Sequence, residues 1–181
     1  KHWGDRAPRP EKTDMPPAGF HWDMWLVVAA ERPFIGGGYY HPGNWRKRLD
    51  FGTGTFGDMG CHILDPVFGS LGQPTPVSAL STGGSANEHN WGLDAEVKYT
   101  FKGTKSAVEG VTLTWYDGDR RPSADVQKLV VQHLPKTKNK KGEELPGKIA
   151  DQGSIYIGEK GVLYSPYIGA PILLPAEKFA D

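Results

Sequence analysis

One central stretch of the chain has apolar residues at helical spacing. Three small turn residues, Gly52-Thr53-Gly54, come first, and the apolar positions that follow recur every three or four residues. This pattern predicts a loop that leads into a buried helix over Asp58 to Ser70. Because Pro66 lacks a backbone N–H, we expect the helix to kink there or to restart with Asp65 as its cap. The apolar positions are Phe56, Met59, Ile63, Val67 and Phe68.

Alternating apolar and polar residues follow this predicted helix. Residues 95 to 102 and 111 to 115 each alternate, and Lys102-Gly103-Thr104 is the turn between them. Such spacing predicts antiparallel strands with one apolar face and one polar, threonine-rich face. Further predicted strands are Thr75 to Ser81, Val126 to Gln132, Ser154 to Ile157 and Val162 to Ser165, with Gly158-Glu159-Lys160-Gly161 as a hairpin turn.

Together these elements predict an α+β fold: a mostly antiparallel, open-faced sheet with the central helix packed on one side. A short apolar helix at Trp22 to Val28 precedes it and follows a proline-rich segment. The chain has 181 residues, which is enough for a full hydrophobic core, and its 24 Gly and 15 Pro are typical of a loop-rich fold. We therefore expect one domain over residues 1–181.

Charge and composition exclude several classes of partner. The 21 basic residues balance 21 acidic ones, so no net field attracts nucleic acid or an anionic membrane surface, and no apolar run is long enough to cross a bilayer. The six His have no metal-ligand spacing, so we predict no metal site. Cys61 is the single cysteine, and in a buried helix it is interpreted as a small apolar residue.

The predicted helix contains a candidate acid/base pair. Asp58 and His62 lie four residues apart, so their side chains project from one helix face, where a carboxylate can orient an imidazole. Imidazole titrates near neutral pH and can accept the hydroxyl proton of an alcohol as that alcohol loses hydride. The alternative is a purely structural pair, since Asp/His pairs at this spacing occur by chance on many helices.

The loop before the helix is aromatic, glycine-rich and basic, a composition typical of a loop that lines a binding site. Arg46 and Trp45 are candidate substrate or cofactor contacts. Arg46 could pair with a substrate carboxylate or a cofactor phosphate; equally, it could bind the protein's own carbonyls or Asp50. Tyr40 and His41 are candidates for contacts with sugar hydroxyls, and a structural role is as well supported for each. Asn87, in a later loop, is a further candidate substrate contact.

Several motifs closely resemble the Gfo/Idh/MocA family, the NAD(P)-dependent oxidoreductases that include glucose-fructose oxidoreductase and inositol dehydrogenase. The resemblance implies the second, substrate-side domain of a bacterial enzyme, a sugar-like substrate, His62 as the acid/base group, and a sheet that commonly packs against a second copy. The motifs are Trp22–Leu26, Glu31–Phe34, Tyr40-His41-Pro42, Asn44-Trp45-Arg46, Asp50–Gly54, Gly57–Asp65, Trp115–Gly118, Gly158–Leu163 and Leu173–Phe179.

One departure from the family pattern qualifies the resemblance. Family members begin with a Rossmann domain that binds NAD or NADP at a Gly-x-Gly-x-x-Gly turn between a strand and a helix. Here Gly36-Gly37-Gly38 leads into aromatic residues and Pro42, and Glu11-Lys12-Thr13 lacks the proline of the family's catalytic Glu-Lys-Pro motif. We therefore expect a fragment truncated at both ends, inactive alone, whose cofactor is bound mainly by the missing domain.

The predicted function is the substrate-binding part of an NAD(P)-dependent oxidoreductase that acts on a sugar, a cyclitol or a derivative. Two alternatives stay open. Some relatives use bound NAD transiently in glycoside cleavage, and a non-catalytic sugar-binding or oligomerisation module would share the same sheet. The compartment, cytoplasmic or periplasmic, is not determined by the residues present.

Overall fold

The computed structural model of the chain describes residues 2–72 and 75–180. Contacts divide the chain into two compact units, Lys1–Arg120 and Arg121–Asp181, and each is described by itself. The single domain predicted over residues 1–181 stays a prediction, because compactness alone does not show whether two units unfold together.

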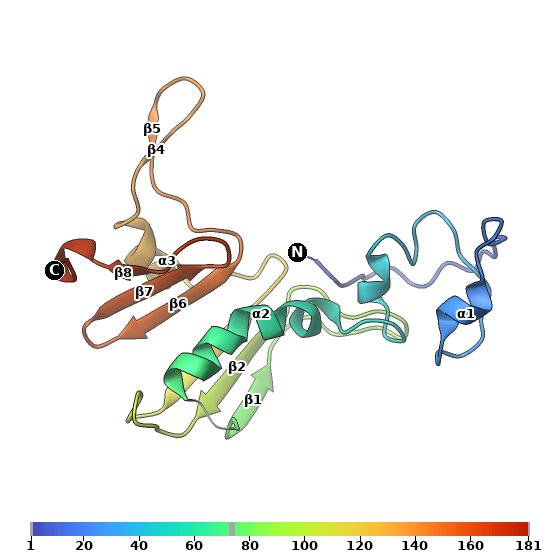
Figure 1. Cartoon of the computed structure of the whole chain (residues 1–181), viewed down its shortest axis with the longest axis horizontal. Helices are drawn as coiled ribbons and strands as arrows, with labels where there is room; N and C mark the ends of the chain where they lie inside the picture. Colours follow the sequence, from blue (N-terminus) through green and yellow to red (C-terminus); the bar gives the residue numbers. More distant parts are fainter. Residues whose placement is uncertain (1, 73–74, 181) are drawn as a thin grey trace. The chain divides into compact units, whose positions relative to one another are not determined.

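The first unit is built on a three-stranded antiparallel sheet with the order β1-β2-β3 (Figure 1). Its strands are β1 (Ser78–Ser81), β2 (Glu96–Phe101) and β3 (Val111–Tyr116). Val97 lies opposite Trp115, and Tyr99 lies opposite Leu113, so one face of the sheet is apolar as the alternation predicts.

Helix α2 (Gly54–Leu71) covers that apolar face. The ring of Phe56 lies 4.9 Å from the ring of Trp115, and Phe68 lies 5.7 Å from Phe101, both edge-on. These contacts place both ends of the helix on the sheet. The α+β class, with antiparallel strands and a helix on one face, is therefore confirmed.

Two local expectations for α2 are corrected. The restart with Asp65 as cap is wrong, because α2 runs from Gly54 to Leu71 with Pro66 inside it, whereas the kink expected there stays a prediction. Cys61 is exposed rather than buried, because it lies two positions after the buried Met59 and so points away from the sheet.

Two short helices precede α2 in the first unit. They are α1 (Trp22–Leu26) and the 3₁₀ helix η1 (Asn44–Lys47). Helix α1 lies at the predicted position and ends two residues early, because Val27 adopts a positive φ of 53° that cannot continue a right-handed helix.

The second unit has its own sheet and core. Strands β6 (Gly153–Gly158), β7 (Gly161–Pro166) and β8 (Ile172–Leu174) pair antiparallel, and Gly158 lies opposite Gly161 across the predicted hairpin turn. A separate two-stranded hairpin pairs β4 (Thr137–Lys138) with β5 (Glu144–Leu145), and η2 (Ala176–Lys178) follows β8. The core consists of Val130, Val162, Tyr164 and Leu174.

The strand predicted at Val126 to Gln132 is wrong, because this segment forms helix α3 (Ala124–Val131). The Ser123 side chain accepts a hydrogen bond from the backbone N–H of Val126, and Asp125 lies in the first turn. Both features stabilise a helix N-terminus. The valines satisfy helical spacing as well as alternation, and Val130 is fully buried in the core of this unit.

Candidate functional site

The candidate site in the first unit centres on Arg46. Its guanidinium carbon lies 4.4 Å from the ring centroid of Trp45 and 5.3 Å from that of Trp3. Its Nε donates a hydrogen bond of 2.8 Å to Oδ1 of Asp58. The Arg46 side chain is 32% exposed and the Asp58 side chain 24% exposed, so solvent and solutes reach the pair. Two aromatic rings and one carboxylate therefore hold a cation at the surface.

Local backbone contacts position this cation against helix α2. In η1 the Trp45 N–H donates to the carbonyl of Tyr40 at 2.7 Å, which fixes the turn that carries Arg46. A side chain at Gly52 would lie 2.4 Å from the Arg46 backbone, so only glycine allows the two segments to approach this closely. Gly54 opens α2 with a positive φ of 65°, directly under the Trp91 side chain. The glycines of the predicted turn therefore bring η1 to the start of the helix.

The predicted acid/base pair lies on the same helix. Asp58 and His62 are one turn apart on α2, with Asp58 half-buried and His62 exposed. Oδ1 of Asp58 accepts from Arg46, a partner that the sequence did not assign to it. The structure therefore brings Trp45, Arg46 and Asp58 together, with His62 one turn further along, and the orienting role of Asp58 toward His62 stays a prediction.

Tyr40 lies in a buried aromatic cluster rather than on an open surface. Its ring centroid lies 5.0 Å from Trp22 and 5.5 Å from both Trp25 and Phe51. Burial raises the pKa of the Tyr40 hydroxyl above its ordinary value. Within residues 2–72 and 75–180 this hydroxyl has no hydrogen-bond partner. The substrate contact predicted for Tyr40 stays a prediction, and the structure shows the ring packing in a core.

His41 and Asn87 have different surroundings. His41 is exposed and precedes Pro42. The amide of Asn87 is bound by the protein's own backbone: its oxygen accepts from the N–H groups of His89 and Asn90, and its nitrogen donates to the carbonyls of Asp5 and Ala7. Both substrate roles stay predictions, and the Asn87 contacts show what the side chain does within the fold.

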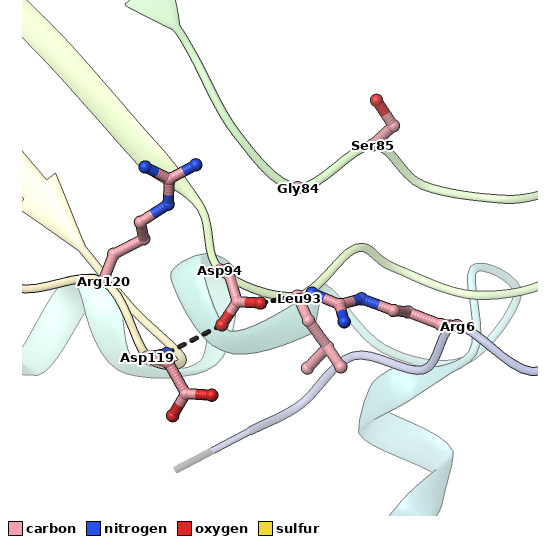
Figure 2. A pocket seen from close by; sticks show the side chains of 7 residues that line it. All are labelled: Arg6, Gly84, Ser85, Leu93, Asp94, Asp119 and Arg120. Atoms are coloured by element: carbon pink, nitrogen blue, oxygen red, sulfur yellow. Dashed lines mark hydrogen bonds and ion pairs between the residues drawn. The ribbon is translucent and has the colours of Figure 1, made fainter.

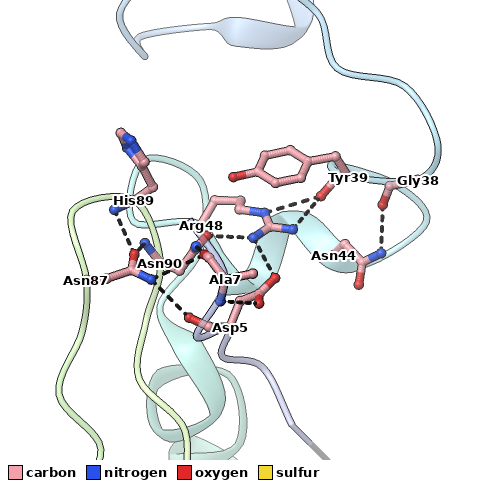
Figure 3. Close-up of polar contacts among 9 residues, drawn as sticks. All are labelled: Asp5, Ala7, Gly38, Tyr39, Asn44, Arg48, Asn87, His89 and Asn90. Carbon is pink, nitrogen blue, oxygen red and sulfur yellow. Dashed lines mark hydrogen bonds and ion pairs between the residues drawn. The ribbon is translucent and has the colours of Figure 1, made fainter. Parts of the chain in front are cut away.

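A buried polar network around Arg48 supports the site, and sequence reasoning missed it (Figure 3). Arg48 is 5% exposed, and its Nη1 donates to Oδ2 of Asp5 at 3.0 Å and to Oδ1 of Asn90 at 2.6 Å. Its Nε and Nη2 donate to the Tyr39 carbonyl at 3.2 and 3.0 Å. The network joins the N-terminal segment, the loop before η1 and the loop before β2, and so fixes the loops around Arg46.

The first unit also has an open polar pocket of about 480 Å³ near the start of β2 (Figure 2). Asp94 pairs with Arg6 and accepts the Asp119 N–H at 2.7 Å. Arg120 also lines the pocket and lies 3.7 Å from Glu96. None of the predicted site residues lines this pocket.

The glycine run that might suggest a nucleotide site does not fit a pyrophosphate. The Gly36 N–H donates to Oδ2 of Asp14 at 2.7 Å, so a carboxylate lies where a phosphate would bind. A hydrogen bond from Lys12 and that of Gly36 lower the pKa of Asp14, which keeps this carboxylate negatively charged. The same charge would repel a phosphate. These residues do not build a dinucleotide site.

Two absences hold for the described part of the chain. No group of three or more His, Cys, Asp or Glu side chains there could hold a metal ion. Likewise, no helix within residues 2–72 and 75–180 has the length and apolar character of a membrane span.

Comparison with known families identifies the chain. The family described as "Oxidoreductase family, C-terminal alpha/beta domain" matches residues 3–113, which contain η1, α2 and most of the first sheet. The chain therefore belongs to the Gfo/Idh/MocA oxidoreductase family, and the match is to the C-terminal domain of that family. A comparison with curated proteins found no match.

Proposed function

We propose that this chain is the substrate-binding part of an NAD(P)-dependent oxidoreductase that acts on a sugar, a cyclitol or a derivative. Membership of an oxidoreductase family supports the reaction class. The observation that carries the proposal is the half-exposed Arg46–Asp58 ion pair, flanked by two tryptophans and one helical turn from His62. Planar charged groups beside indole rings suit a ligand that has both hydroxyl groups and apolar C–H surface.

In this proposal His62 acts on the hydroxyl proton of the substrate. An alcohol loses hydride readily only when its hydroxyl proton leaves with it, and an imidazole at the substrate hydroxyl accepts that proton. Because His62 is exposed, the proton then passes to solvent. Asp58 lies one turn earlier on the same helix and binds Arg46.

The cofactor supplies the hydride acceptor when it is bound. In this proposal the glycine turn at Gly36 does not bind its pyrophosphate, since the Gly36 N–H already donates to Oδ2 of Asp14. In the family NAD(P) is generally bound by the N-terminal domain, so the residues of this chain bind and orient the substrate and move its proton.

The proposal is tested with an intact enzyme, a protein that carries these residues and binds the cofactor. A panel of neutral sugars and cyclitols is incubated with NAD or NADP, and reduced cofactor is followed by absorbance. The proposal expects turnover with at least one member of the panel. Turnover with no sugar or cyclitol, in an enzyme shown by calorimetry to bind the cofactor, would contradict it.

A further inference from the structure

One edge strand of the second unit lacks the usual protection of an exposed sheet edge. The strand order in this unit is β6-β7-β8, so β6 and β8 are the two edges (Figure 1). Strand β8 has three residues and is followed directly by Pro175, and short edges that end in proline resist pairing with another strand. Strand β6 has six residues without a charge or a proline. Of the two edges, β6 is therefore the one suited to accept a further strand.

The register shows which backbone groups of β6 point to that edge. In an antiparallel pair every second residue hydrogen-bonds to the neighbouring strand. The Tyr167 N–H donates to the Gln152 carbonyl at 2.9 Å, and these two residues continue the register of the β6–β7 pairs. Even-numbered residues of β6 therefore bond β7, whereas the N–H and C=O groups of Ile155 and Ile157 point to the edge.

The side chains of β6 complement a second copy of the same strand. Antiparallel pairing about a two-fold axis through Tyr156 brings Ile155 beside Ile157 of the second copy twice, and it brings the two Tyr156 rings together. A shift by two residues in either direction would instead place Ile157 beside Gly153, or Ile155 beside Glu159. Ile157 is 58% exposed, so pairing removes apolar surface from water. The strand is self-complementary in one register.

The charge of the chain allows two copies to approach each other. The 21 basic residues balance 21 acidic ones, so two copies do not repel one another at long range. No charged side chain lies within β6, and the self-complementary register brings Lys160 opposite the neutral Gln152 of the second copy. An unrelated peptide would match only the backbone groups of this edge, whereas a second copy matches the side chains as well. A second copy is therefore the partner that the edge fits.

We propose that β6 is an interface between two copies of the chain, in which the strands pair antiparallel through Ile155 and Ile157. This contact involves residues of the second unit only and is independent of the proposed reaction. Two short strands bury much less than the roughly 1,200 Å² of a stable interface, so the contact is weak, with a dissociation constant on the order of 10⁻⁴ M. At about 10 µM it contributes little, and at about 1 mM most copies are paired.

Amide exchange and light scattering test this interface over the same range of concentration. We expect the N–H groups of Ile155 and Ile157 to exchange with water several times more slowly at about 1 mM than at about 10 µM, because pairing buries them. The Tyr156 N–H bonds β7 and is the internal control, since its exchange rate should not depend on concentration. The average molar mass should rise at least about twofold from the lower to the higher concentration.

Substitutions assign the effect to this edge. Ile157→Lys keeps the backbone of β6 and places a charge on the edge, so it should abolish the rise in mass. Ile168→Lys is the matched control, because Ile168 is 87% exposed in the loop between β7 and β8, and it should keep the rise. Ile155→Pro removes an edge donor without removing a bond to β7, and it should also abolish the rise. Circular dichroism shows whether each variant keeps the fold.

Three results would overturn the β6 interface. The first is a mass and amide exchange rates that stay constant between the two concentrations. The second is a rise in mass that persists in both Ile157→Lys and Ile155→Pro, because the copies would then associate through another surface. The third is slow exchange of the Ile155 and Ile157 amides already at the lower concentration, because the edge would then be covered without a second copy.

Discussion

Arg46 and Asp58 are twelve residues apart in the sequence, and Nε of the arginine lies 2.8 Å from Oδ1 of the aspartate. The ion pair joins η1 to helix α2, two elements that the glycine turn brings together. The ion pair changes the role of both residues. The Arg46 cation already has an anionic partner, and the Asp58 carboxylate already binds Arg46 in addition to any contact with His62. The pair is therefore the centre of the site.

Arg48→Met should lower the free energy of unfolding by roughly 3 kcal/mol, because it leaves Asp5 and Asn90 without their buried partner. Urea denaturation of the chain measures this change. The control is Arg6→Met, which removes an arginine whose side chain is 75% exposed and should cost at most about 1 kcal/mol. Equal effects of the two substitutions would show that the network around Arg48 contributes little.

Tyr40→Phe should raise the free energy of unfolding by about 1 kcal/mol, because the buried Tyr40 hydroxyl has no partner among the described residues. The matched control is Tyr164→Phe: Tyr164 is equally buried, but its hydroxyl accepts a hydrogen bond of 2.7 Å from the Ala150 N–H. That control should lose about 1 kcal/mol. Urea denaturation compares the two variants. An equal loss of unfolding free energy in both would contradict the claim that the Tyr40 hydroxyl has no partner.

The same substitution has a defined pH dependence. Burial raises the pKa of Tyr40 in the folded state, so the fold favours the neutral phenol. That contribution is fully present below the ordinary tyrosine value of about 10 and is lost as the pH rises through the higher folded value. Tyr40→Phe should therefore weaken the fall in stability above about pH 10. Part of the fall in stability should remain in the variant, because burial raises the pKa of Tyr39 as well.

Ser123→Ala should destabilise the second unit by about 1 kcal/mol, because the Ser123 hydroxyl accepts from Val126 N at 3.4 Å at the start of α3. Ser123→Asp keeps an N-cap acceptor and should retain most of the stability. Thermal unfolding followed by circular dichroism compares the two. Equal unfolding temperatures for the alanine and aspartate variants would show that the cap does not stabilise this helix.

The sequence predicts those parts of the fold in which the interacting residues lie close together along the chain. The helix around Met59 and the hairpin at Gly158 were predicted because local periodicity and turn chemistry specify them. The strand prediction at Val126 to Gln132 was wrong because these seven residues, rich in valine, satisfy both the helical and the strand period, and only the N-cap at Ser123 distinguishes a helix from a strand here. That serine, followed by Asp125, was the available signal.

The site was predicted in part for the same reason. Asp58 and His62 lie within one motif and Arg46 lies in another shortly before it, so their proximity follows from a turn and a helix. Arg48 meets Asp5 and Asn90 across 43 and 42 residues, and no local pattern encodes such contacts. The sequence did not predict the pairing of Arg46 with Asp58 either, because several carboxylates lie near Arg46 along the chain.

We predict that the chain is a homodimer through the outer face of β1-β2-β3. Leu80 lies opposite Lys98 on that face, is 60% exposed, and shares the face with the residues Thr100, Thr112, Thr114 and Tyr116. Light scattering should give twice the chain mass of 19.8 kDa. Leu80→Asp should reduce this to a monomer, whereas Val108→Asp, in the exposed β2–β3 loop, should not. A monomeric unaltered chain would contradict the prediction.

The central claim is that His62 moves the substrate proton in a site organised by Arg46 and Asp58. The most direct measurement is the steady-state rate of sugar oxidation by the intact enzyme carrying His62→Ala, with Cys61→Ala as the neighbouring exposed control. We predict that kcat falls by a factor on the order of 10² to 10⁴ in the histidine variant, the usual contribution of a positioned general base. The cysteine variant should keep its kcat, and an unchanged kcat in His62→Ala would contradict the account.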